Sequence, residues 1–258
     1  RSSDLENTCK LSNLPELITF DIQGNNFSAL NIGELKKVKN LDLTNNKFTT
    51  TDNITLSAAA EKLPLQGNEN LQKVDLTPYK KLWIVNVNGY KRGQDVADHN
   101  NPLSFANINL NGLTDLESVR VNNNSLASVF DGNTVYPSLG TLEAEYNAIN
   151  PIGMVNIAKS IESFDGLSLK LGYQTFAVNV KDNKTVDYSM VNGFFTNKGK
   201  KLSFEVTLGE DVVTDGYTYN NGIFTFSKAG TYKLSSESFN DILNNSVNDY
   251  KSKPFTIE

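Results

Sequence analysis

One pattern of apolar and asparagine residues, called the phrase below, occurs twice near the start of the chain. It constrains the fold more than any other feature. The first copy is Leu17-x-x-Phe20-x-Ile22-x-x-Asn25-x-Phe27. The second copy is Val38-x-x-Leu41-x-Leu43-x-x-Asn46-x-Phe48. Residues two apart along a strand point to the same side, so each copy predicts a short strand with one buried face. The asparagine follows where the chain turns, and its amide can bond backbone groups that the turn leaves unpaired.

The phrase recurs along the chain and identifies a leucine-rich repeat. The first inward strand positions of the six copies are Phe20, Leu41, Leu63, Val85, Val119 and Leu142. Subtracting successive positions gives spacings of 21, 22, 22, 34 and 23 residues. One unit cannot bury its apolar side alone, so the units stack into a solenoid with a parallel sheet. Such short repeats leave little room for helices, so we expect a convex side of 3₁₀ turns and extended chain, with a helix near residues 56–61.

Several copies are irregular. Pro64 lies in the third strand and cannot donate a hydrogen bond, which predicts a local defect in the sheet. Tyr90 replaces the asparagine of the fourth copy, and Gly166 interrupts a seventh copy that would begin at Ile161. Residues 71–76 also fit the strand template, but they lie only 11 residues before the copy at Leu82, so we assign them to the returning convex segment.

The spacing of 34 residues contains an insertion at residues 91–106. Its glycine, proline, aspartate and asparagine content is typical of a loop. Long insertions in solenoids often emerge on one face and bind ligands. A binding loop and an inert surface loop both fit this composition.

The pattern changes near residue 166, which predicts two domains: a solenoid with an N-terminal cap over residues 1–166, and an immunoglobulin-like β-sandwich over residues 167–258. Alternating strands are expected at residues 175–180, 185–191, 201–208, 217–219, 222–227, 230–235 and 254–258. Asn221-Gly222 is a strong signal for a two-residue hairpin turn. Tyr232 resembles the tyrosine found at the start of a late strand in such sandwiches, and residues 236–248 predict a short helix.

Leucine-rich phrases followed by a sandwich without paired cysteines resemble the secreted leucine-rich repeat proteins of bacteria, and specifically the internalin-like architecture. The resemblance covers essentially the whole chain. It implies display at the cell surface and protein recognition through the concave strand face.

Composition excludes other classes of protein. The net charge is −5 and no basic cluster predicts contact with nucleic acid. No apolar run has transmembrane length, and the start at Arg1 without methionine predicts that an upstream segment was removed. Cys9 is the only cysteine, which we expect to be a half-buried thiol of the cap, and His99 is the only histidine. We therefore expect no metal, no cofactor and no enzyme activity.

The phasing of the repeats names the residues that point outward on the concave face. Aromatic and arginine side chains are favoured in binding hot spots, so Trp83, Tyr90, Arg120 and Tyr146 are the first candidates. Packing of Trp83 against a neighbouring turn, and solvation of the acidic side chains, are the alternatives. The candidate ligand-binding residues are Trp83, Asn86, Asn88, Tyr90, Arg120, Asn122, Glu143, Glu145 and Tyr146.

These observations predict a non-catalytic, extracellular binding protein that recognises a protein partner through the concave face, for example as a bacterial surface adhesin. We expect it to be secreted or anchored at the cell surface, and monomeric. One alternative is a carbohydrate-binding accessory protein, in which Asn86, Asn88 and Asn122 beside Trp83 hold a sugar. The other is a structural spacer without a ligand of its own.

Overall fold

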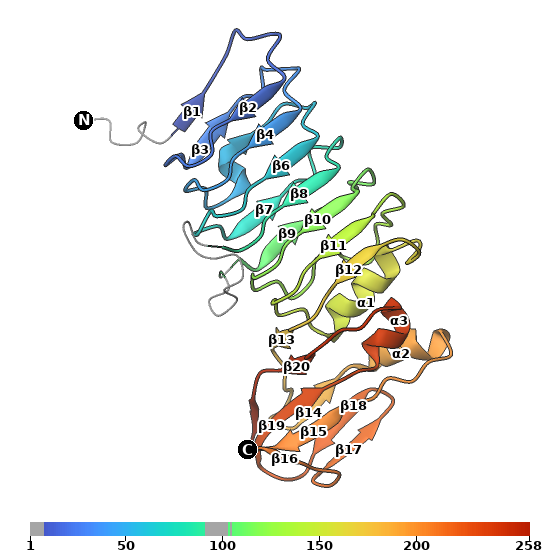
Figure 1. Ribbon diagram of the computed structural model, residues 1–258. Coiled ribbons are helices and arrows are strands. Elements are labelled where there is room, and N and C mark those ends of the chain that lie inside the picture. Colours follow the sequence, from blue (N-terminus) through green and yellow to red (C-terminus); the bar gives the residue numbers. More distant parts are fainter. Residues whose placement is uncertain (1–7, 91–102, 104) are drawn as a thin grey trace, which may run out of the picture.

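A seven-stranded parallel sheet runs along the first part of the molecule (Figure 1). The computed structural model describes residues 8–90, 103 and 105–258. In six of the strands the buried middle residue is the first inward residue predicted for a repeat, from Phe20 to Leu142, and in the seventh it is Leu169. This confirms the leucine-rich repeat solenoid and its phasing. The strands in spatial order are β12 (Ser168–Lys170), β11 (Thr141–Glu143), β10 (Ser118–Arg120), β8 (Ile84–Asn86), β6 (Lys62–Pro64), β4 (Asn40–Asp42) and β2 (Thr19–Asp21).

The returning segments on the convex side are mostly extended, as the short repeats predict. The 3₁₀ turn η1 (Thr51–Asn53) lies between them. The prediction of a helix at residues 56–61 is wrong. The chain makes a tight turn there before it re-enters the sheet. Cys9 is half-buried in the first strand, and burial raises the pKa of its thiol. The convex strands form two small parallel sheets, β1 (Thr8–Lys10), β3 (Ala29–Asn31) and β5 (Ile54–Thr55), then β7 (Lys73–Asp75) and β9 (Asn107–Asn109).

The phrase asparagines form a ladder that joins neighbouring repeats. Asn147 is buried, and its Nδ2 donates to the carbonyls of Ala144 in its own repeat and Val121 in the preceding one. Its Oδ1 accepts the backbone N–H of Leu126. Asn46 and Asn68 make the equivalent bonds. Each rung therefore satisfies backbone groups that the sharp turn after the strand would leave unpaired.

Pro64 weakens the sheet locally, as predicted. Strands β6 and β8 pair over three residues, whereas β4 and β6 pair only at Asn40 and Lys62. Pro64 has no N–H to donate to β4, although its carbonyl still accepts from Leu43.

The solenoid sheet continues beyond the boundary predicted at residue 166. Strand β12 pairs with β11 in register, and it is the seventh strand of the sheet. Gln174 replaces the asparagine of this repeat, donating to the carbonyls of Ala144 and Leu171 and accepting the N–H of Ile149. The strand of the seventh repeat is thus centred on Leu169, and the copy predicted to begin at Ile161 does not form the strand. Helix α1 (Pro151–Ser160) is an addition to the mostly non-helical convex side, capped by the Asn150 side chain.

The C-terminal part is built on antiparallel sheets, which is compatible with the immunoglobulin-like expectation. The predicted strand over residues 185–191 is wrong in its second half, where α2 begins, because Val191 and Phe195 bury one helical face. The Asn221-Gly222 turn joins β17 to β18 as predicted, and Tyr232 donates to the Lys228 carbonyl at 2.9 Å. The elements are β13 (Thr175–Phe176), β14 (Thr185–Asp187), α2 (Ser189–Asn197), β15 (Glu205–Leu208), β16 (Asp211–Val212), β17 (Tyr217–Asn220), β18 (Ile223–Phe226), β19 (Gly230–Ser235), α3 (Phe239–Leu243), β20 (Lys251–Ser252) and β21 (Phe255–Ile257).

Hydrogen bonds from backbone and side-chain groups join the two parts closely. Strand β13 leaves the solenoid and pairs in parallel with β20 of the C-terminal part. The Asn245 side chain donates to the Leu169 carbonyl at 2.9 Å, and the Tyr173 N–H donates to the Asn248 carbonyl at 2.7 Å. Helices α1, α2 and α3 meet at this junction (Figure 1). Within the described residues, no helix has the length and apolar character needed to cross a membrane.

Candidate functional site

The in-register sheet brings outward side chains from distant parts of the sequence into rows across the concave face. Asn86 of β8 lies opposite Arg120 of β10, and Arg120 lies opposite Glu143 of β11. The next residue in this row is Lys170 of β12. Three of the predicted residues are therefore neighbours although 57 residues of sequence separate the first from the last, counting from 86 to 143.

The charges in this row compensate one another. Arg120 Nε lies 3.3 Å from Glu143, and Lys170 Nζ lies 3.1 Å from the other carboxylate oxygen. The Glu143 side chain is 17% exposed, whereas those of Arg120 and Lys170 are 39% and 52% exposed. Two cations therefore surround one partly buried anion, and the negative charge of Glu143 is compensated within the row.

A pocket of about 360 Å³ opens on the concave face where the strands end. Burial raises the pKa of the Tyr90 phenol there, and the negative charges of Glu143 and Glu145 raise it further. Asn45 and Gly67 lie in the turns that follow β4 and β6, and both have positive φ. The pocket brings together four of the nine candidate residues. It is lined by Thr44, Asn45, Gln66, Gly67, Asn88, Tyr90, Asn122 and Glu143.

The concave asparagines hold the repeats together. Asn88 Oδ1 accepts the backbone N–H of Asn122 at 2.8 Å, and Asn122 Oδ1 accepts that of Glu145 at 2.8 Å. Asn86 Nδ2 donates to the Gln66 side chain. Substituting these amides would therefore change the backbone as well as the surface, and the charged and aromatic residues are cleaner probes of binding.

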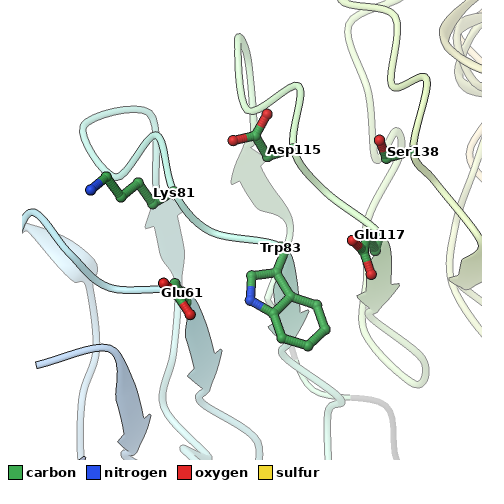
Figure 2. Close-up of a pocket in the computed structure, with 6 residues that line it drawn as sticks. All are labelled: Glu61, Lys81, Trp83, Asp115, Glu117 and Ser138. Carbon is green, nitrogen blue, oxygen red and sulfur yellow. The ribbon is translucent and has the colours of Figure 1, made fainter. Parts of the chain in front are cut away.

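Trp83 lies one residue before the start of β8, whereas Tyr90 follows the end of that strand. Trp83 therefore does not share a site with Tyr90 and Tyr146. It lines an open pocket of about 590 Å³ with Glu61, Lys81, Asp115, Glu117 and Ser138. Figure 2 shows the indole between the carboxylates of Glu61 and Glu117.

Some groups around Trp83 already interact with other residues of the chain. Lys62 Nζ lies 4.6 Å from the centre of the indole ring, a cation–π distance. A hydrogen bond from Lys39, 2.7 Å away, holds the pKa of Glu61 below its usual range, and a bond from Trp83 adds to the effect. Glu117 is exposed and forms no ion pair with the residues that the structure describes.

Tyr146 stacks on Tyr173 at the end of the solenoid. Their ring centres are 4.6 Å apart and the ring planes differ by 3°. Sequence reasoning missed Tyr173 and Lys170, because both belong to the seventh repeat. Glutamine at position 174 in place of asparagine was the signal for that repeat, since both side chains end in an amide. Glu61 and Glu117 were also missed, because they precede their strands.

The structure gives no basis for a metal centre in the described part of the chain. Residues 8–90, 103 and 105–258 contain no group of three or more histidine, cysteine, aspartate or glutamate side chains placed to hold an ion. His99 and most of the insertion at 91–106 lie outside the described residues.

Comparison with known proteins agrees with the fold. No protein-family model and no curated protein matches the sequence. Among solved structures, the chain resembles the functional domain of InlJ from Listeria monocytogenes, which includes a cysteine ladder, with a TM-score of 0.59 and 16% identity. The match covers 95% of this chain and 49% of that one, so the chain spans about half its length. This chain has one cysteine, and its ladder is made of asparagine and glutamine. Its fold is therefore an internalin-like leucine-rich repeat solenoid joined to antiparallel sheets.

Proposed function

We propose that this chain is a non-catalytic, extracellular binding protein that recognises a protein partner through its concave face, as a bacterial surface adhesin. The observation that carries the proposal is the concave pocket of Tyr90, Asn88, Asn122 and Glu143. Solenoids of stacked repeats create extended concave surfaces of this kind, and many use them for binding.

The chemistry of the pocket favours a protein surface. Tyrosine and arginine are enriched among residues that dominate interface energies, and Tyr90 and Arg120 both lie near Glu143. The asparagine ladder fixes the backbone beneath them. Binding to a rigid, preformed surface loses little conformational entropy, which favours affinity.

The test is a binding screen of the chain against purified extracellular-matrix proteins and host receptors, followed by variants. Arg120→Ala removes one exposed cation but leaves Glu143 paired with Lys170, so the fold is expected to persist. We expect Arg120→Ala and Tyr90→Ala each to weaken binding roughly tenfold or more, as hot-spot residues do. Val212→Ala, on the exposed strand β16, is the matched control and should bind normally.

The fluorescence of Trp83, the only tryptophan, reports whether each variant is folded. Folded Arg120 and Tyr90 variants that bind as tightly as the parent would show that the concave site is wrong. No saturable partner in the screen would favour the spacer hypothesis.

A second candidate function is carbohydrate binding at the Trp83 pocket. The indole lies between Glu61 and Glu117, and carboxylates accept hydrogen bonds from sugar hydroxyls while the ring offers an apolar face. Saturable binding on a glycan array, lost in Trp83→Ala but retained in Arg120→Ala, would support this function over protein recognition.

A further inference from the structure

The junction between the solenoid and the C-terminal part gathers exposed apolar side chains. Eight large apolar residues are exposed in the described part of the chain, and three of them lie here. They are Tyr173 at 42%, Ile152 at 48% and Met190 at 80% exposure. They line two pockets of about 420 and 280 Å³, which share Asn150 and Ala177 and so adjoin as one groove. We call this surface the junction groove.

The first half of the junction groove has an aromatic wall. Tyr146 and Tyr173 form the stacked pair, and alanines at 127, 148 and 177 contribute small apolar surface. Lys253 lies at the same pocket and makes no ion pair with any carboxylate in the described residues. A ligand with apolar groups and a nearby negative charge would complement this half.

The backbone at both tyrosines is unusual for a bulky residue. Tyr146 has φ of 55° and Tyr173 has φ of 61°, in the left-handed region. Earlier repeats place small or turn-forming residues at the same point, namely Gly24, Asn45, Gly67 and Asn123, all with positive φ. Bulky side chains in this conformation are strained, and such strain clusters at functional sites. The two tyrosines replace residues that would fit the backbone better.

The second half of the junction groove is aliphatic. Ile152 comes from α1, and Met190 comes from the first turn of α2. Lys181 and Asp187 also line it and pair with each other at 3.3 Å, so their charges are already compensated. Methionine at a surface adapts its shape to varied apolar partners. This half therefore fits an apolar side chain and has little to offer a sugar.

The groove is preformed, because hydrogen bonds fix both of its sides. Gln174 anchors the end of the solenoid beneath Tyr173, and Lys251 N–H donates to the Gln174 carbonyl at 3.1 Å. Lys253 N–H donates to the Phe176 carbonyl at 2.7 Å. A ligand would not have to order the junction when it binds.

We propose that the junction groove binds an extended peptide segment of a partner protein, with one apolar side chain against the tyrosine pair, a second against Ile152 and Met190, and a carboxylate facing Lys253. Three features favour an acidic, apolar peptide over a glycan. They are the combined length of the two pockets, the aliphatic second half, and Lys253, which pairs with no carboxylate among the described residues. Tyr146 lies close enough to Tyr90 to raise the pKa of its phenol, but Tyr90, Arg120 and Glu143 do not line the groove. Variants of Arg120 and of Lys253 therefore test the function proposed above and the groove separately.

The two methionines of the chain allow a direct test. Met154 is fully buried and Met190 is 80% exposed, so methyl-labelled methionine gives an internal control and a reporter in one NMR spectrum. The probe is a displayed library of random linear peptides selected on the full chain, from which enriched peptides are synthesised and titrated. We expect enriched peptides to combine two apolar residues with an aspartate or glutamate, and to shift the Met190 signal but not the Met154 signal.

Variants then locate the contacts. Tyr146→Asn and Tyr173→Asn introduce the residue that Asn45 and Asn123 already place in this conformation, so folding should be retained. We expect each, and Lys253→Glu, to weaken peptide binding roughly tenfold or more, while Arg120→Ala leaves it unchanged. Retained melting temperatures exclude a folding defect as the cause.

Three outcomes would overturn the proposal. In the first, no peptide from the library shifts the Met190 signal. In the second, the tyrosine variants bind such peptides as tightly as the parent. In the third, the Met190 signal responds to glycans or to the chain's own concentration instead of to peptides. The last outcome would assign the groove to a sugar or to a second copy of the chain.

Discussion

Substituting Asn68 by alanine tests whether the ladder holds the solenoid together. Asn68 is 1% exposed, and its Nδ2 donates to the carbonyls of Leu43 at 3.1 Å and Leu65 at 2.7 Å. Its Oδ1 accepts the backbone N–H of Phe48 at 3.0 Å. Alanine would remove all three bonds, although Leu43 keeps a bond from Asn46 at 3.2 Å.

Two buried backbone groups, the Phe48 N–H and the Leu65 carbonyl, would then lose their partner. Each buried polar group left unsatisfied costs about 1–3 kcal/mol, so Asn68→Ala should lower the free energy of unfolding by roughly 2–6 kcal/mol. Asn25 provides the matched control, because it holds the same repeat position but is exposed and bonds only to carbonyls of its own repeat, those of Ile22 and Gln23. Asn25→Ala should cost less than about 1 kcal/mol.

The assay is urea unfolding followed by the fluorescence of Trp83, which lies in the solenoid. A lower midpoint with an unchanged slope reports lost stability rather than a changed denatured state. Equal losses for Asn68→Ala and Asn25→Ala would refute the reasoning, because the bonds between repeats would then contribute nothing beyond those within one repeat.

Three further predictions follow from local geometry. Gly222→Ala should destabilise the protein by more than about 2 kcal/mol, because φ is 85° and the added methyl would lie 2.6 Å from the Tyr188 carbonyl oxygen. Gly199→Ala, with φ of 66° and open space, should cost only about 1 kcal/mol in the same urea titration. Tyr250→Phe should stabilise by about 1 kcal/mol, because the buried hydroxyl has no hydrogen-bond partner in the described residues; a lower urea midpoint would contradict this. Burial raises the pKa of Tyr219 to about 12, so the unfolded state, with a pKa of about 10, ionises first. Stability should therefore fall as pH rises from about 10 to about 12, and urea midpoints measured across this range should fall less steeply in Tyr219→Phe.

The C-terminal part shows where local patterns were insufficient. Residues 185–191 alternate like a strand, yet the strand ends at Asp187, whose carboxylate accepts the N–H and hydroxyl of Ser189 as α2 begins. Phe195 then packs edge-on against Phe239, with ring centres 5.5 Å apart. Contact with a residue 44 positions later, counting from 195 to 239, decides the helix, and no short window of sequence contains that contact.

The sequence predicted which side chains point outward on the concave face, but not which of them share a pocket. The phrase alone placed Asn86, Arg120 and Glu143 on one face, because the two-residue period of a strand fixes which side chains point outward. The sequence pattern placed Trp83 and Tyr90 in one candidate site, although they lie beyond opposite ends of β8. It also did not reveal that Lys170 pairs with Glu143, because the seventh strand carries an altered phrase.

The sequence by itself determined the solenoid, its strand phase and the local defect at Pro64, because these depend on a short period repeated many times and each copy reinforces the others. Only the tertiary structure decided which side chains share a pocket, where the solenoid ends, and how Tyr146 meets Tyr173 beside Lys253. Those contacts join residues that are far apart in the chain. They arise from stacking and from the docking of the C-terminal part, which no local pattern encodes.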